Sequence, residues 1–203
     1  SDDKVVAIVG STQSSTTIAT SQVAADNRIP FLAIAPITSD NEYVFQMNFG
    51  NKEVLNKAVE YLVDRNITRI AWINARDAFG QDGLPYFEEL AKEKALEIVA
   101  VEDFDASATD MTVQLTKIKQ KNPEALIVWS RQPGANVVAK NFKQLGFNIP
   151  MIQSHAAASD SFKDSLGAEG EGILVLGGKI SVYNQLPGDQ QEHYRKFAED
   201  FQN

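Results

Sequence analysis

A run of hydroxyl side chains follows the first apolar stretch of the chain. Six of the seven residues from Ser11 to Thr17 carry a hydroxyl, and they come directly after Val5–Val9 and Gly10. This order predicts a buried strand, a turn at the glycine and a helix that begins among Ser and Thr residues. The first N–H groups of a helix lack helical partners and carry a partial positive charge. The run therefore indicates a seat for a carboxylate or phosphate, although capping is the commoner role of Ser and Thr at a helix start.

Further polar loops follow the other apolar runs. These loops are Ala35–Ser39, Asn74–Gly80, Ser130–Gln132 and Ser154–Ala157. In parallel α/β structures, ligands meet the loops at the carboxyl ends of strands. We therefore expect the loops to line a cleft between two lobes. Taken singly, Phe79 could belong to the core, Arg131 could pair with a surface carboxylate and His155 could be structural.

Signatures of catalysis are missing from the sequence. It contains no GxGxxG, GxxxxGK[ST], GxSxG or HExxH motif, and its two histidines, His155 and His193, lie far apart. With no cysteine in the chain, disulfides, thiolate metal sites and a cysteine nucleophile are excluded. We therefore expect neither an enzyme nor a bound cofactor or metal.

Composition narrows the class of partner. The chain has 203 residues and a net charge of -8, which argues against nucleic acid and anionic membranes. No apolar run approaches the roughly 20 residues of a membrane helix. The chain opens with Ser1–Lys4, without a signal-peptide pattern, and it stops inside an amphipathic stretch, Ala198–Asn203. We expect a fragment of a longer protein.

The order of elements predicts an α/β fold with parallel sheets covered by helices on both faces, because β-rich runs alternate with amphipathic stretches and are almost continuously apolar. Strands are expected at Val5–Val9, Phe31–Ala35, Arg69–Ile73, Glu97–Val101, Ala125–Trp129, Pro150–Gln153 and Gly172–Leu176. Helical stripes are formed by Val54, Leu55, Ala58, Val59 and Leu62, by Phe87, Leu90 and Ala91, by Met111, Leu115 and Ile118, and by Val137, Val138, Phe142 and Leu145. Thr109 or Asp110 can cap the third of these helices.

Two segments interrupt the alternation. Pro36–Gly50 is irregular, with a short extended piece at Tyr43–Asn48, and Gly177–Pro187 is a second unusual connection. We interpret both as crossings between lobes. The expected division is residues 1–50 in one lobe, 51–176 in a complete second lobe, and 177–203 as a crossing and return to the first.

The chain resembles the type I periplasmic binding proteins of ABC transporters, and within them the branched-chain amino-acid (Leu/Ile/Val) branch. The stretches that carry the resemblance are Val5–Gly10, Arg28–Ala35, Tyr43–Gln46, Asp77–Leu84, Ala108–Lys119, Gln144–Phe147 and Ala168–Ile173. The resemblance covers essentially the whole chain. It implies a two-lobed fold of Rossmann-like parallel sheets, with one lobe incomplete here.

The resemblance also implies binding residues. In the family, a Ser/Thr loop binds the carboxylate of the ligand, which corresponds to Ser14 and Ser15. The loop before the first crossing contributes backbone and hydroxyl contacts, at Ile37 and Thr38. An aromatic residue closes over the ligand from the second lobe, and its position matches Phe79.

Two positions depart from the family pattern. The acidic residue that binds the α-ammonium of an amino acid falls near His155, and an aromatic residue of the cleft falls near Arg131 or Gln132. A histidine cannot replace a carboxylate as the partner of an ammonium group, whereas Arg131 offers donors suited to a second carboxylate. These departures favour an organic or aromatic acid over an amino acid.

The function that the resemblance implies is that of an exported receptor, periplasmic or at the cell surface. It would bind a small carboxylate-bearing ligand in the cleft and present it to the membrane permease of an ABC importer. Self-association through cut sheet edges is expected too. One alternative is the ligand-sensing domain of a regulator or receptor of the same superfamily. Another is a Rossmann-like enzyme that uses Ser14 or His155.

Overall fold

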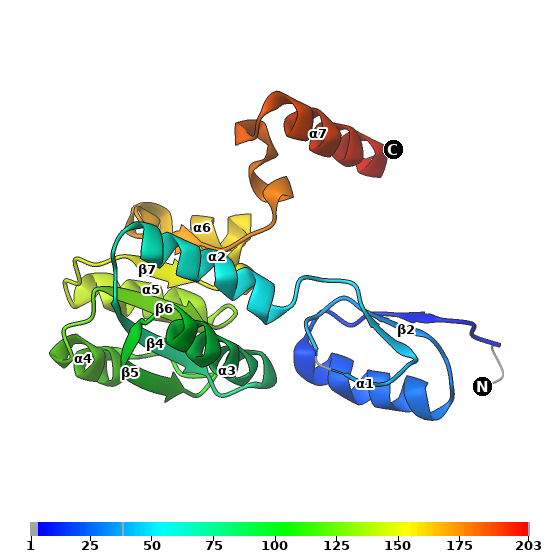
Figure 1. Cartoon of the computed structure of the whole chain (residues 1–203), viewed down its shortest axis with the longest axis horizontal. Coiled ribbons are helices and arrows are strands. Elements are labelled where there is room, and N and C mark those ends of the chain that lie inside the picture. The colour runs from blue at the N-terminus through cyan, green and yellow to red at the C-terminus, as the bar shows by residue number, and fades with distance from the viewer. Residues whose placement is uncertain (1–3, 38, 203) are drawn as a thin grey trace.

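The protein forms two parallel β-sheets with helices packed against them (Figure 1). The computed structural model describes residues 4–37 and 39–202. The strands are β1 (Ile8–Val9), β2 (Phe31–Ala33), β3 (Val44–Gln46), β4 (Arg69–Ala75), β5 (Glu97–Phe104), β6 (Ala125–Trp129), β7 (Met151–Gln153) and β8 (Leu174–Val175). The helices are α1 (Ser14–Asp26), α2 (Asn51–Asp64), α3 (Ala78–Glu93), α4 (Thr112–Gln120), α5 (Gly134–Gln144), α6 (Asp160–Leu166) and α7 (Gly188–Gln202). Short 3₁₀ helices are η1 (His155–Ala157), η2 (Gly167–Gly170) and η3 (Lys179–Gln185). This architecture confirms the predicted α/β class.

The larger sheet has the strand order β5-β4-β6-β7-β8, with every neighbouring pair parallel. Helices α2 and α3 cover one face, where Trp72 and Trp129 lie fully buried. Helices α4, α5 and α6 cover the other face. Because both faces are covered, β6 is buried along its whole length, which explains its uninterrupted apolar sequence.

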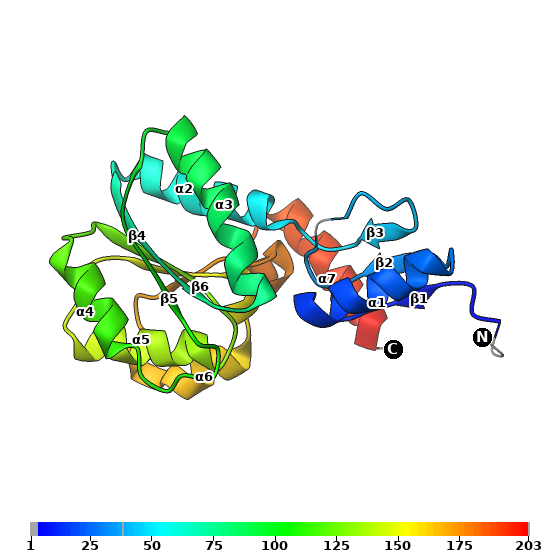
Figure 2. The same cartoon turned by 90° about the horizontal axis from the view of Figure 1, so that it is seen from below.

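The smaller sheet has the order β1-β2-β3, and within the described residues a helix covers only one of its faces. Helix α1 lies along this sheet (Figure 2), and its Ala24 belongs to the same buried cluster as Phe31 and Ala33 of β2. On the opposite face, Val9, Phe45 and Met47 are exposed. Strand β1 is shorter than the predicted strand from residue 5 to 9, and β2 ends two residues before the predicted position. The extended piece predicted at residues 43–48 contains β3, which joins the sheet.

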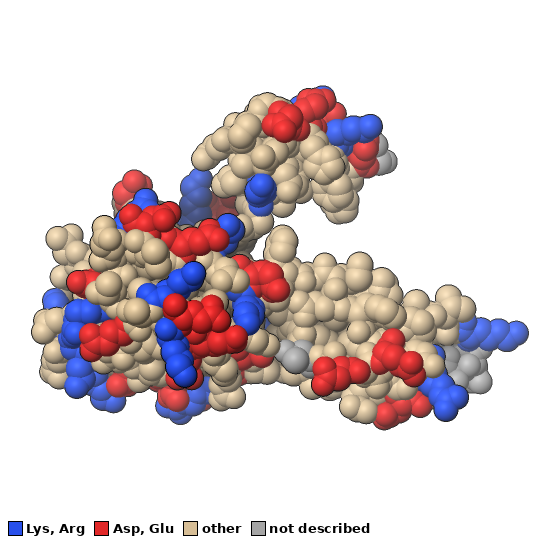
Figure 3. Space-filling model, viewed as in Figure 1, with Lys and Arg blue, Asp and Glu red and all other residues tan. Residues whose placement is uncertain are grey.

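The C-terminal helix α7 extends away from both sheets, after η3 (Figure 1). Figure 3 shows a wide hollow between α7 and the uncovered face of the smaller sheet, with few charged side chains along it. Among the described residues, no helix combines the length and the hydrophobicity needed to cross a membrane. The division of the chain at residues 50 and 176 stays a prediction.

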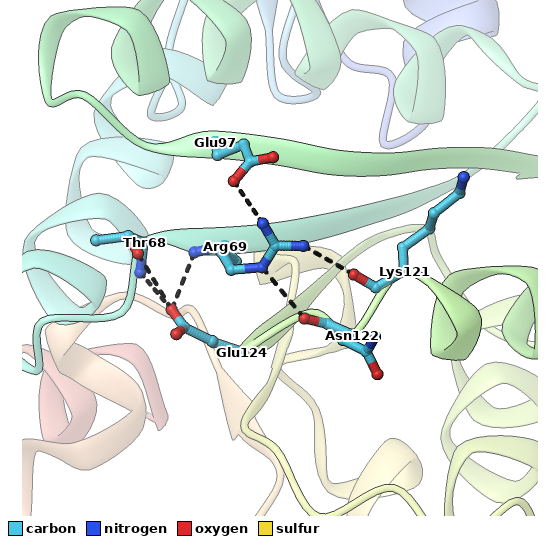
Figure 4. Close-up of polar contacts among 6 residues, drawn as sticks. All are labelled: Thr68, Arg69, Glu97, Lys121, Asn122 and Glu124. Carbon is cyan, nitrogen blue, oxygen red and sulfur yellow. Dashed lines mark hydrogen bonds and ion pairs between the residues drawn. The ribbon is translucent and has the colours of Figure 1, made fainter.

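A polar network closes the amino-terminal edge of the larger sheet (Figure 4). Glu124 Oε2 accepts hydrogen bonds from the backbone N–H groups of Thr68 and Arg69, at 2.7 and 3.0 Å. These two bonds hold the pKa of the Glu124 carboxyl below its usual range. The guanidinium of Arg69 pairs with Glu97 at 2.6 Å and donates to the carbonyl oxygen of Lys121 at 3.0 Å. The network links the starts of β4, β5 and β6. The candidate site lies at the opposite, carboxyl edge of the sheet.

Candidate functional site

Among the described residues, no side chain caps the N-terminus of α1. Gln13 occupies the N-cap position, and its side chain makes no capping hydrogen bond. The hydroxyl of Thr17 instead donates to the carbonyl oxygen of Ser11 at 3.1 Å, and the hydroxyls of these two residues lie 3.2 Å apart. The alternative reading of the run, in which its Ser and Thr side chains cap the helix, is therefore not seen among the described residues. The helix keeps first-turn N–H donors that no side-chain cap occupies.

The two serines predicted to bind a carboxylate differ in exposure. Ser14, the first residue of α1, is only 5% exposed, whereas Ser15 is exposed. Ile37, which follows β2, is buried at 8% exposure. Thr38 lies outside the described residues. The start of α1 adjoins α3 of the larger sheet, and the two helices contact each other (Figures 1 and 2).

At the carboxyl edge of the larger sheet, three rings form an aromatic cluster: Phe79, Trp129 and His155. Phe79 stacks on Trp129, with ring centroids 5.9 Å apart and planes 14° apart. His155 presents its edge to both rings, at 5.4 and 5.8 Å. Phe79 is only 3% exposed, because its ring belongs to the core beneath α3. The loops after β4, β6 and β7 thus meet as the sheet topology predicts, but Phe79 lies beneath the surface rather than open to a cleft.

An ion pair borders this cluster. Arg131 Nη2 lies 2.7 Å from Asp77 Oδ2, and each side chain is about one quarter exposed. The guanidinium carbon of Arg131 lies 5.7 Å from the ring centroid of Phe79. The other oxygen of Asp77, Oδ1, accepts the N–H of Gly80 at 2.7 Å and so caps α3. Arg131 therefore has a carboxylate partner within the protein.

His155 is uncharged at neutral pH in this environment. Burial lowers the pKa of its imidazole to about 4, because the charged form loses solvation. Its Nδ1 atom is buried and has no hydrogen-bond partner among the described residues. This nitrogen can form a hydrogen bond with a ligand or a water molecule, but the neutral imidazole cannot neutralise the charge of an ammonium group.

Some of the predicted site residues line one of two cavities. One, of about 530 Å³, includes Ile37 together with Asn51 and Asp82. The other, of about 610 Å³, places His155 beside Phe49, Leu176 and Ile180, with Glu53, Lys57 and Lys179 also in its lining. Ser14, Ser15, Phe79 and Arg131 line neither cavity. The structure therefore groups Phe79, Arg131 and His155, and it leaves Ile37 in a separate cavity.

Sequence reasoning missed Asp77 as a member of the site. The residue lies in the polar loop after β4, which the sequence singles out, and an Asp before an apolar helical stretch is a signal for a helix N-cap. Its second role, the pairing with Arg131 across 54 positions of sequence, has no sequence signal. Tyr194 of α7, which lines the cavity at His155, had no signal either.

Comparison with known proteins matches the whole chain to one family. A family model described as periplasmic binding protein covers residues 1–203. An extracellular ligand-binding receptor from Rhodopseudomonas palustris HaA2 superposes with a TM-score of 0.89 at 24% identity, over 98% of this chain and 58% of that one. The chain thus spans less than two thirds of the length of this receptor.

Two further solved structures share the fold. A leucine binding protein from Thermotoga maritima superposes with a TM-score of 0.79 at 20% identity, over 85% of this chain and 51% of that one. A branched chain amino acid ABC transporter protein from Thermus thermophilus, with bound valine, gives a TM-score of 0.76 at 19% identity, over 85% and 46% of the two chains. At these identities the likeness shows the fold. The family match over residues 1–203 confirms the predicted resemblance.

Proposed function

Because the chain belongs to the periplasmic binding protein family, we propose that it is the solute-binding receptor of an ABC importer. It is exported, to the periplasm or the cell surface, and binds a small carboxylate-bearing ligand between the two sheets. Contacts that bridge both sides favour a closed form, since a ligand shifts a conformational equilibrium only through its different affinity for the two forms. The closed form is presented to a membrane permease.

The observation that carries this proposal is the open N-terminus of α1 beside α3. The helix start offers first-turn N–H groups and the hydroxyls of Ser14 and Ser15, and no side chain in the described part of the chain competes as a cap. A carboxylate at this position interacts favourably with the partial positive charge of the helix end. Because α1 contacts α3, this carboxylate site lies next to the larger sheet.

The ligand proposed for this seat is an organic acid rather than an amino acid. An α-ammonium group needs a carboxylate or several acceptors, and the family position for that carboxylate falls near His155. Burial keeps its imidazole neutral at pH 7, because its pKa is about 4. The cavity beside His155 is lined by the apolar side chains of Phe49, Leu176 and Ile180, which favour an aromatic or branched aliphatic acid.

A thermal-shift competition screen tests this function. The panel consists of amino acids, aliphatic acids and aromatic acids, and we expect stabilisation by acids that lack an ammonium group. Ser14→Ala should weaken binding of the best acid about tenfold or more, because a hydrogen bond to a charged group contributes about 1.5–3 kcal/mol.

Thr20→Ala is the matched control for this variant. Thr20 lies in the second turn of the same helix, and its hydroxyl donates to the carbonyl oxygen of Thr16 rather than facing the first-turn N–H groups. Its replacement should leave the affinity for the acid unchanged. Stabilisation by leucine or valine alone would contradict the proposed ligand class. Stabilisation by no compound in the panel would contradict the carboxylate receptor itself.

A further inference from the structure

The charge of Arg131 is balanced within the protein before any ligand arrives. Asp77 Oδ2 lies 2.7 Å from Arg131 Nη2, and Asp77 Oδ1 is held by the N–H of Gly80 at the same distance. The carboxylate is fixed at both oxygens and lies at the N-terminus of α3, where negative charge is favoured. The pair as a whole carries no net charge.

This balance changes what Arg131 can recognise. A guanidinium without a partner attracts a carboxylate through its planar set of donors. Here an approaching carboxylate would meet the negative charge of Asp77 at close range and would compete with it for the same guanidinium. The neighbouring imidazole of His155 is neutral and offers no compensating charge.

The buried rings further restrict which ligand groups can approach Arg131. Phe79 and Trp129 fill the space behind the pair, and Arg131 lies over the face of Phe79 at 5.7 Å. The guanidinium is therefore held between a carboxylate and an aromatic ring, which restricts its reorientation towards a ligand. A neutral or apolar group can approach this region without leaving a charge unpaired.

Resting on the proposed function, we propose that Asp77 determines the specificity of the site. By neutralising Arg131 it excludes ligands that carry a second carboxylate, so that the solute is a monocarboxylate whose far end is uncharged. Asp77 acts on the ligand through Arg131 and is thus a positioning residue.

Isothermal titration with matched acids tests this inference. The probes are hexanoate and adipate, benzoate and terephthalate, and leucine. The protein should bind the better monocarboxylate at least about tenfold more tightly than its dicarboxylate counterpart. Asp77→Asn keeps a side chain that can cap α3 but removes the negative charge, so the preference should shift about tenfold towards the dicarboxylate.

Two further variants separate specificity from structure. In the double variant Asp77→Asn, Arg131→Gln, the gain for the dicarboxylate should disappear, because the freed guanidinium is gone. Asp103→Asn removes the carboxylate of a similar pair with Arg76, also at 2.7 Å, and should leave the ratio of affinities unchanged. A merely structural role for Asp77 would weaken both acids alike without moving the ratio.

The possible results of the titrations distinguish a failure of the inference from a failure of the proposed function. If the unmodified protein binds a dicarboxylate as tightly as its monocarboxylate, the inference is wrong while the receptor function stands, and this comparison needs no variant to fold. An unchanged ratio in Asp77→Asn, with helical content intact by circular dichroism, overturns it too. If leucine alone binds, the proposed class of acids without an ammonium group fails, and the inference, which rests on that class, fails with it. If none of the five compounds binds, the proposed carboxylate receptor fails as well.

Discussion

Burial gives His155 a protonation behaviour unlike that of a solvated histidine. The imidazole lies against Phe79 and Trp129, its Nδ1 lacks a partner among the described residues, and its pKa falls to about 4. The unfolded chain binds this proton near pH 6.5, whereas the folded protein binds it only near pH 4. The contribution of His155 to stability is therefore fully present above about pH 6.5 and is lost as the pH falls towards 4.

His155→Gln should remove this part of the pH dependence. Between pH 7 and about pH 5.5, the unmodified protein should lose about 1 kcal/mol more of its free energy of unfolding than the variant does. Urea denaturation at the two pH values measures the difference. His193→Gln is the control, because His193 is exposed on α7 and its replacement leaves the core untouched. An equal loss of stability in all three proteins would show that His155 is not buried as described.

At the scale of elements, the close packing of α3 on β6 holds the aromatic cluster in place. A Cβ atom added at Gly83 would lie 2.5 Å from the indole of Trp129, which is fully buried and has Phe79 stacked on it. The indole cannot move without disturbing its neighbours, so only glycine fits at this position of the helix.

Gly83→Ala should therefore destabilise the larger sheet by about 1–2 kcal/mol. Overpacking costs about 1–3 kcal/mol, and the higher helix propensity of alanine offsets up to about 1 kcal/mol of it. Thermal unfolding followed by tryptophan fluorescence is a specific measurement, because both tryptophans, Trp72 and Trp129, lie in this core. Gly188→Ala, at the start of α7, meets no atom within 4 Å and should change stability little. Equal stability of the two variants would refute the tight contact.

The elements that sequence predicts best are those with a full set of neighbours. The buried stripe of α2 and the strand β6 match their predictions, because burial on the predicted face leaves an apolar pattern in the sequence. Strand β5 continues three residues beyond the prediction, through Glu102 and Asp103, because an edge strand tolerates polar side chains. Strand β1 is shorter than predicted, because its apolar run continues into residues without a pairing partner.

The sequence does not predict which side chains pair with one another through hydrogen bonds or ion pairs. At the start of α4, Met111 occupies the N-cap position, and Asp110 accepts the N–H of Thr112 instead of capping the helix as predicted. Similarly, the sequence places Arg131 at the edge that carries the site, but not its pairing with Asp77. Sheet topology determines which loops meet, and this follows from the order of elements. Which donor meets which acceptor depends on distances of a few ångströms, which no periodicity encodes.

At the scale of the whole molecule, the two sheets differ in how completely they are covered. The larger sheet has helices on both faces, whereas the smaller sheet has α1 on one face and exposes Val9, Phe45 and Met47 on the other. Helix α7 exposes Phe197 and Phe201, and a hollow separates it from this face in Figure 3. Apolar surface of this kind on a three-stranded sheet with unpaired edges favours association with another chain.

We therefore predict that the protein self-associates through the uncovered face and edges of the smaller sheet. Sedimentation velocity over a range of concentrations should show a dimer or larger species, because association removes Phe45 and its neighbours from water. Phe45→Lys places a charge on the edge strand β3 and should shift the distribution towards monomer. Val113→Lys, which replaces another exposed apolar side chain, on α4, should leave the distribution unchanged. A monomer at the highest concentration would exclude self-association. An equal effect of both variants would show that the association does not depend on this face of the smaller sheet.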